Sequence, residues 1–151
     1  GRMAAKGKIN TDILHRLNQL EFYAMNAPKS LGREWFLEQF LPLIRQSGIA
    51  STDLMATLVE HIAQQISQGI NDAGIGSLLV TGGGTLNQTL MGRLKIHTHA
   101  SLVIPEELLI HYKEALIFAL LGVLKIRGEI NCLASVTGGK KDLSAGIIHL
   151  I

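Results

Sequence analysis

The sequence is short of the residues that mark several common classes of protein. Its 151 residues include one cysteine, Cys132, which permits no internal disulfide and suits a reducing cytoplasm, where we expect the protein to act. The net charge of +2 arises from interspersed signs and leaves no electrostatic footprint for nucleic acid or an anionic membrane. The longest apolar run, at 115–124, is far shorter than the roughly 20 residues that a membrane-spanning helix needs. We therefore expect neither nucleic acid nor a membrane as a partner.

Apolar residues, in contrast, are plentiful, since 47% of the chain is hydrophobic and only 17% is charged. A chain of this length is expected to form one domain, over 1–151, and to bury most of its apolar surface. The remaining apolar residues suggest an additional face that meets another domain or subunit.

The most informative stretch is 77–94, SLLVTGGGTLNQTLMGRL. Its apolar run at 78–80 is too short for a helix and favours a strand that is buried on both faces. Three glycines follow at 82–84, and then a segment with helical spacing begins. A strand, a glycine turn and a helix start present backbone N–H groups to a phosphate, and glycine lets a flat ligand lie on the backbone. A tight strand-to-helix turn without a ligand explains the same pattern.

Capping residues and apolar periodicity predict further elements on both sides of this stretch. Asn10 is expected to cap the first helix, and Pro42 to kink or end the second. The expected elements are helices beginning at 11, about 35 and 51, a helix with Leu90, Met91 and Leu94 on one face, a helix at about 107–127, and strands at 78–80, 100–104 and 145–151.

Two of these helices carry specific expectations about burial. The helix at about 107–127 is apolar almost all round after Glu114, so we expect it to be buried. The helix from Ser51 has two neighbouring apolar stripes, which are Leu54, Leu58, Ile62 and Ile66, and beside them Met55, Val59, Ala63 and Ile70.

The expected elements alternate in the order α-α-α-β-α-β-α-β. Strands that are separated by helices are typical of a parallel sheet. We therefore predict an α/β fold with a narrow, mainly parallel sheet of three strands that is covered by helices.

Four segments resemble the C-terminal half of anhydro-N-acetylmuramic acid kinase, in that family's order and spacing. They are KSLGRE at 29–34, GGGTLNQTLMGRL at 82–94, KEALIFALLGVL at 113–124 and NCLASVTGGKKDLSAGII at 131–148. The resemblance covers nearly the whole chain. It implies the C-terminal lobe of an actin-like ATPase, a ribonuclease-H-like fold in which two lobes close on ATP and a sugar.

The resemblance also implies an activity and a missing half. The family uses ATP and Mg²⁺ to open the 1,6-anhydro ring of anhydro-N-acetylmuramic acid and to phosphorylate O6 in cell-wall recycling. Its members are more than twice as long as this chain, and the aspartate that activates water lies upstream of the segments found here. We therefore expect no catalytic residue and no metal ligand in this chain, and no kinase activity from the chain alone. The face left open by the absent N-terminal lobe is expected to form a homo-oligomer.

The resemblance assigns two segments to the nucleotide. From its position alone, Asn87 either caps the following helix or binds the ligand, and the cap is preferred. The VTG turn at 136–138 is expected near the nucleotide, although a plain structural turn accounts for it as well. The nucleotide-binding residues implied in this way are Gly82, Gly83, Gly84, Asn87, Thr137 and Gly138.

The same resemblance assigns Glu114 to the sugar, although a solvated glutamate near a helix end is the simpler interpretation of its position. The segment KSLGRE differs from the family's usual KSTGRE because Leu31 replaces a hydroxyl residue. Lys29 and Arg33 are expected to meet phosphate or carboxylate groups of the substrate, with solvated charges as the alternative. Ser30 is a candidate cap for the next helix.

Other constellations are weaker. His97 and His99 would share one face of a strand, but two histidines without a third ligand make a poor metal site. A glycine pair after a strand, with Glu106 about 20 residues further on, is also typical of dinucleotide-binding oxidoreductases, but Asn87 stands where the third glycine belongs. The main alternative to a kinase lobe is a non-catalytic docking or dimerisation module with a vestigial nucleotide cleft.

Overall fold

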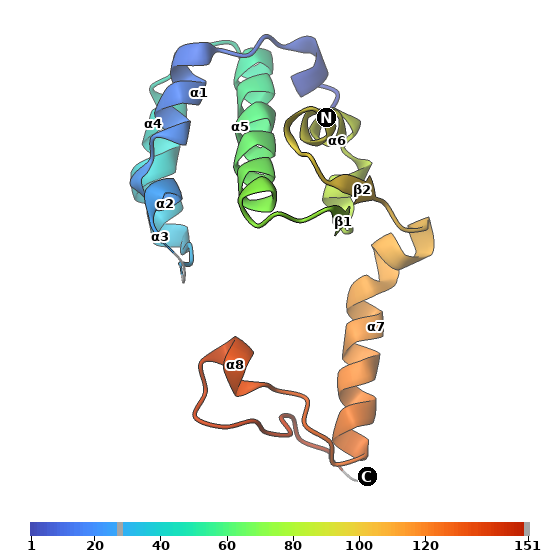
Figure 1. The fold of residues 1–151 in the computed structure, drawn as a ribbon. Coiled ribbons are helices and arrows are strands. Elements are labelled where there is room, and N and C mark those ends of the chain that lie inside the picture. Colours follow the sequence, from blue (N-terminus) through green and yellow to red (C-terminus); the bar gives the residue numbers. More distant parts are fainter. Residues whose placement is uncertain (27–28, 150–151) are drawn as a thin grey trace. The chain divides into compact units, whose positions relative to one another are not determined.

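The computed structural model describes residues 1–26 and 29–149. Its internal contacts divide the chain into two compact units, Gly1–Pro105 and Glu106–Ile151 (Figure 1). They are called here the N-terminal unit and the C-terminal unit.

The N-terminal unit begins with a short 3-10 turn, η1 (Ala4–Lys6), and the helices α1 (Thr11–Asn18) and α2 (Glu21–Ala24). The predicted cap of α1 is confirmed, because the Asn10 side-chain oxygen accepts a 3.0 Å hydrogen bond from the backbone N–H of Ile13. Ile13 and Leu17, which are four residues apart on one face of α1, are both buried.

The second predicted helix is built from three pieces, α3 (Arg33–Trp35), the π-helical η2 (Phe36–Phe40) and α4 (Leu41–Arg45). Pro42 lies in the first turn of α4 and does not end the helical segment, which continues without a break from Arg33 to Arg45. Because proline lacks an N–H and its ring crowds the preceding turn, the wider π turn directly before α4 accommodates it. The predicted cap by Ser30 is wrong, since no side chain caps α3.

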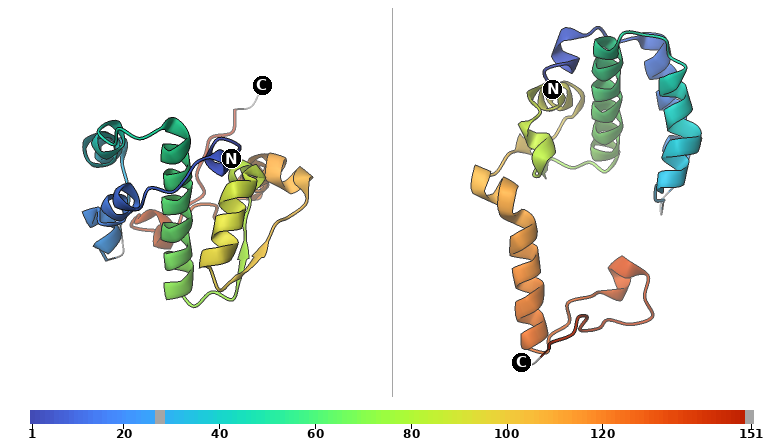
Figure 2. Two further views of the ribbon diagram at one scale, coloured as in Figure 1. Left: turned by 90° about the horizontal axis from the view of Figure 1, so that it is seen from above. Right: turned by 180° about the vertical axis from the view of Figure 1, so that it is seen from behind.

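Helix α5 (Ser51–Asp72) is the central element of the N-terminal unit. Helices α1 to α4 lie on one side of it and α6 on the other (Figures 1 and 2). The first predicted apolar stripe is not its buried face, because Ile62 and Ile66 are 42% and 41% exposed. Polar side chains that find partners on the flanking helices share the inner face instead. The buried residues of α5 are Ala56, Thr57, Val59, Glu60, His61, Ala63, Ser67 and Ile70.

The predicted parallel strand pair is confirmed. Strand β1 (Ser77–Leu79) pairs with β2 (Ser101–Val103) in parallel, with Leu78 opposite Leu102. Helix α6 (Gln88–His97) connects the two strands and packs between them and α5. As predicted, it buries Met91 and Leu94, and Leu90 packs against the same cluster. The apolar cluster consists of Ala63, Met91 and Leu94, with Val80, Leu90 and Leu102 packed against it.

Two predictions about the strands are wrong. Leu79 is 57% exposed, so β1 is covered on one face only and not on both. Residues 145–149 form no strand, and 150–151 lie outside the described residues. The described sheet therefore has two strands. A two-stranded sheet packed on one layer of helices leaves its other face without cover, which explains the exposure of Leu79.

The C-terminal unit contains the long helix α7 (Glu107–Ile126) and the single turn α8 (Ala134–Thr137). The prediction that α7 is buried is wrong, because none of its residues is buried. The helix that the apolar pattern predicts is confirmed, but burial requires a partner surface, and neither α8 nor the segment around it covers α7 on all sides. No helix in the described ranges is long and apolar enough to span a membrane.

Candidate functional site

The glycine segment follows β1 as a tight turn that leads directly into α6. Gly82 has a φ of 87° and a ψ of 173°, a backbone conformation that favours glycine. The 3-10 turn η3 (Gly83–Leu86) follows. It is stabilised by two hydrogen bonds that the Gly82 carbonyl accepts from the N–H and the hydroxyl of Thr85, at 3.0 and 2.7 Å. The predicted sequence of strand, glycine turn and helix is confirmed.

Asn87 is the cap of α6, as the sequence predicts. Its side-chain oxygen accepts a 3.1 Å hydrogen bond from the backbone N–H of Leu90. The space above the three glycines is open, because a Cβ atom built on Gly82, Gly83 or Gly84 would have no neighbour within 4 Å. The turn therefore has room for a ligand to approach its backbone, and it ends at a helix N-terminus, whose partial positive charge favours anions.

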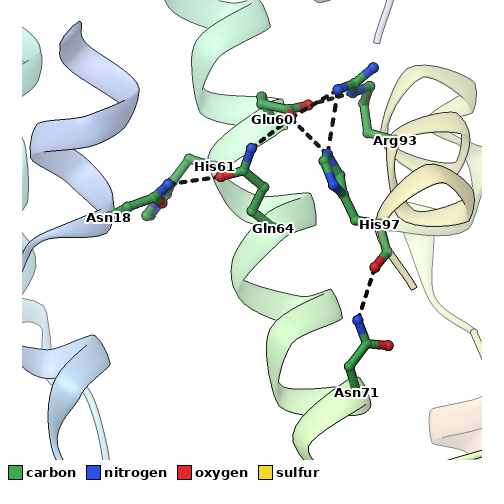
Figure 3. Close-up of polar contacts among 7 residues, drawn as sticks. All are labelled: Asn18, Glu60, His61, Gln64, Asn71, Arg93 and His97. Carbon is green, nitrogen blue, oxygen red and sulfur yellow. Dashed lines mark hydrogen bonds and ion pairs between the residues drawn. The ribbon is translucent and has the colours of Figure 1, made fainter. Parts of the chain in front are cut away.

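A buried polar network, which the residue pattern does not predict, lies between α5 and α6 (Figure 3). Its centre is Glu60 on α5, whose side chain is 3% exposed. One carboxylate oxygen accepts hydrogen bonds from Arg93 at 2.9 Å and from Gln64 at 2.8 Å, and the other accepts from the Arg93 Nε. The Nε2 atom of His97 lies 2.7 Å from the first oxygen.

These contacts decide the charge of Glu60. Burial by itself would raise its pKa, but the hydrogen bonds from Arg93, Gln64 and His97 and the charge of Arg93 outweigh burial and lower the pKa to about 2. The hydrogen bond with Glu60 in turn raises the pKa of Arg93. The pair is therefore ionised at neutral pH.

On the α1 side of α5, His61 is buried at 2% exposure and bonded at both ring nitrogens. Nδ1 lies 2.6 Å from the side-chain oxygen of Asn18, and Nε2 lies 2.9 Å from the hydroxyl of Tyr23. Because an amide oxygen only accepts, we assign the proton to Nδ1, and Nε2 then accepts from Tyr23. Burial lowers the pKa of His61 to about 4, so this histidine is neutral at pH 7.

Gln64 joins the two halves of the network across α5. Its amide oxygen accepts a 2.8 Å hydrogen bond from Asn18, and its amide nitrogen donates to Glu60. Hydrogen bonds therefore run without a break from Tyr23 on α2 to Arg93 on α6. The available signal in the sequence is the adjacent pair Glu60-His61 in a helix with two apolar stripes, but the partners of these two residues are distant in sequence.

The predicted substrate residues Lys29 and Arg33 lie on the other side of α5 from the glycine turn. Lys29 Nζ donates to the backbone carbonyls of Phe22 and Tyr23, at 3.0 and 3.2 Å, and lies 4.9 Å from the centre of the Phe22 ring. Its charge is thus placed at the carboxyl end of α2, where cations are favoured. Arg33 is exposed at the start of α3.

The other predicted site residues belong to the C-terminal unit. Thr137 and Gly138 form a turn, in which Gly138 has a φ of 72° and the Thr137 hydroxyl donates to the Leu133 carbonyl at 2.9 Å. Glu114 is exposed on α7. Neither segment lines the apolar pocket of about 710 Å³ that the C-terminal unit forms between α7 and residues 145–148. Within the N-terminal unit, the structure brings the three glycines and Asn87 together in one turn.

The predicted strand position of His97 is wrong, because this residue is the last of α6 and its ring contacts Glu60. In 1–26 and 29–149, no three His, Cys, Asp or Glu side chains are grouped closely enough to hold a metal ion.

Comparison with known proteins gives one consistent result. The model of the family "Anhydro-N-acetylmuramic acid kinase" matches residues 1–150. The chain is 36% identical to the anhydro-N-acetylmuramic acid kinase of Pasteurella multocida over 158 aligned positions, covering 97% of the chain and 41% of the relative. It is 34% identical to the enzyme of that name from Rhodococcus erythropolis, covering 93% of the chain and 36% of the relative.

The protein of the same name from Streptomyces coelicolor is 32% identical, over 98% of the chain and 39% of the relative. The chain thus spans about two fifths of the length of the curated relatives it matches. The family match covers all but one residue, so its range includes the glycine turn, α5 and nearly all of the C-terminal unit. The chain belongs to the anhydro-N-acetylmuramic acid kinase family.

Proposed function

We propose that this chain is the C-terminal, nucleotide- and sugar-binding lobe of an ATP-dependent kinase that cleaves and phosphorylates 1,6-anhydro-N-acetylmuramic acid in cell-wall recycling. Family membership over 1–150 supports the activity, and the partial coverage of the relatives supports a lobe. In this proposal the fold is one lobe of an actin-like ATPase, and both units belong to that single lobe. The partner is the N-terminal lobe, which supplies the catalytic residues.

The observation that carries the proposal is the open glycine turn at the start of α6. Gly82 has a positive φ of 87°, which favours glycine, and a Cβ atom built on any of the three glycines would have no neighbour within 4 Å. We assign the adenosine side of ATP to Gly82, Gly83, Gly84 and Asn87. Thr137 and Gly138 are also assigned to the nucleotide, on the resemblance to the family. ATP with Mg²⁺ supplies the transferred phosphoryl group, and this chain's residues bind and orient its nucleoside part.

The sugar is assigned to Glu114, Lys29 and Arg33. The exposed carboxylate of Glu114 is free to accept hydrogen bonds from sugar hydroxyls. Arg33 is likewise exposed, whereas Lys29 must exchange its bonds to the α2 carbonyls for a substrate contact. The exposed apolar residues of α7 support association with the N-terminal lobe or with a second copy of the chain.

Titration of the ¹⁵N-labelled chain with magnesium-ADP, followed by amide NMR, tests the nucleotide assignment. We expect shifts concentrated at 82–90, and weaker binding for Gly83→Val, because a branched side chain then occupies the space above the turn. A Gly92→Ala variant is the matched control, since its Cβ also meets open space but lies within α6. Shifts that avoid 82–90, or equal binding by Gly83→Val, would contradict the assignment. Magnesium-dependent phosphorylation of the anhydro-sugar by the purified chain alone would contradict the lobe proposal.

A further inference from the structure

We propose that Glu60 is a positioning residue for the nucleotide site, which it controls by fixing α6 through Arg93 and His97. This inference rests on the proposed function, because it concerns the same glycine turn. Glu60 itself does not touch the nucleotide in this account. It acts on the helix that begins directly after the turn.

The geometry of α6 supports this role. Arg93 and His97 are four residues apart, so they lie on the same face of the helix, and both contact the Glu60 carboxylate. The end of α6 is held to α5 a second time, because the Asn71 side chain donates to the His97 carbonyl at 2.9 Å and accepts from the His99 N–H at 3.0 Å. Polar bonds from α5 thus set both the rotation and the axial position of α6.

The apolar contacts of α6 are less selective. Met91 and Leu94 on α6 pack against Ala63 on α5. The alanine side chain is small, so this contact places few steric restrictions on the orientation of α6. Apolar packing is non-directional, whereas a bidentate carboxylate–guanidinium pair has one preferred geometry. Because Asn87 and the glycine turn are continuous with α6, a rotation of the helix also moves the backbone that faces the ligand.

A direct ligand role for Glu60 is incompatible with its surroundings. Both carboxylate oxygens are used by side chains of α5 and α6, and the residue is 3% exposed. A buried ion pair of this kind adds little net stability relative to an apolar pair, and its best-attested contribution is to the specificity of packing. The structure therefore assigns Glu60 to the register of α6 against α5.

The test compares Glu60→Gln with Tyr23→Phe in the ¹⁵N-labelled chain. Tyr23→Phe removes a hydrogen bond from the same network on the opposite side of α5, and so controls for general loss of stability. Both are measured equally far below their own Tm. We expect Glu60→Gln to weaken magnesium-ADP binding about tenfold, to shift the amide signals of Gly82–Gly84 and to accelerate exchange of the Leu90 N–H. Tyr23→Phe should change none of these.

Equal effects of the two variants would overturn the proposal, and so would unchanged Leu90 exchange in Glu60→Gln. Arg93→Lys keeps the charge but not the bidentate geometry, and it decides the question in the same way if Glu60→Gln does not fold. If the unsubstituted chain does not bind ADP, the nucleotide assignment fails. The amide shifts and Leu90 exchange then still decide whether Glu60 positions the turn.

Discussion

Glu60 on α5 and Arg93 on α6 form a bidentate ion pair between residues that are 33 positions apart, with the Arg93 Nη2 atom 2.9 Å from Glu60 Oε1. Glu60 is almost fully buried, while the Arg93 side chain is 32% exposed. The pair joins α6, the helix that follows the glycine turn, to α5, the central helix of the N-terminal unit. It therefore connects the packing of this unit to its proposed site.

Removing Arg93 is expected to expose the dependence of the fold on this pair. Arg93→Met should lower the free energy of unfolding at pH 7 by about 3 kcal/mol, the low end for a broken buried pair because Arg93 is partly solvated. Urea unfolding measures the loss, and Arg16→Met, on the exposed side of α1, is the control.

The pH dependence supplies a second readout of the pair. The folded-state pKa of Glu60 is lowered to about 2, so its stabilisation is complete above about pH 4.5 and is lost as the pH falls toward 2. The difference in the free energy of unfolding between the unsubstituted chain and Arg93→Met should therefore become smaller as the pH falls from 4.5 toward 2. A difference that stays constant from pH 5 to pH 2 would contradict the assigned charge of Glu60.

His61 should make the chain less stable in mildly acidic solution. Burial lowers its folded-state pKa from 6.5 to about 4, so the unfolded chain binds more protons between these values. The free energy of unfolding should fall by up to about 3 kcal/mol as the pH decreases from 6.5 to 4. His61→Gln should flatten this dependence, while His15→Gln, at an exposed position, should leave it intact. If the free energy of unfolding depends on pH in the same way in both variants, the lowered pKa assigned to His61 is contradicted.

The glycines of the turn should differ from one another in their effect on stability. Gly82 has a φ of 87°, whereas Gly83 has no positive φ, so a side chain at Gly83 causes no backbone strain of this kind. Gly82→Ala is expected to cost about 1–3 kcal/mol, because only glycine readily adopts this combination of positive φ and extended ψ. Gly83→Ala should cost less, because its Cβ meets open space. Thermal unfolding of the two variants decides this, and equal Tm values would count against the turn geometry.

Turns and helix caps could be predicted from the sequence. The glycine turn and the Asn10 and Asn87 caps follow from residue types within a few positions of one another, whereas the parallel pairing of β1 with β2 follows from the helix that separates the two strands. The turn and the caps are set by backbone conformation and short-range hydrogen bonds, which do not depend on distant parts of the chain.

Long-range partnerships were not readable in the same way. Glu60 interrupts an apolar face, but nothing near it in the sequence points to Arg93, and His61 likewise depends on Asn18. Apolar periodicity predicted α7 as a helix and also predicted its burial, which is wrong because burial requires a second surface. The π turn before Pro42 reflects local crowding whose outcome the proline alone does not determine.

The central claim is that this lobe binds the nucleotide at the glycine turn and the sugar at Glu114. Steady-state kinetics of a kinase that contains this lobe, with each substrate varied in turn, tests it most directly. We expect Gly83→Val to raise the KM for ATP with little change for the sugar, and Glu114→Gln to raise the KM for the sugar roughly 10- to 150-fold with little change for ATP. Both variants are compared at matched distance from their Tm. If both variants raise the KM of the same substrate, or Gly83→Val leaves the ATP dependence untouched, the assignment of the two sites is wrong.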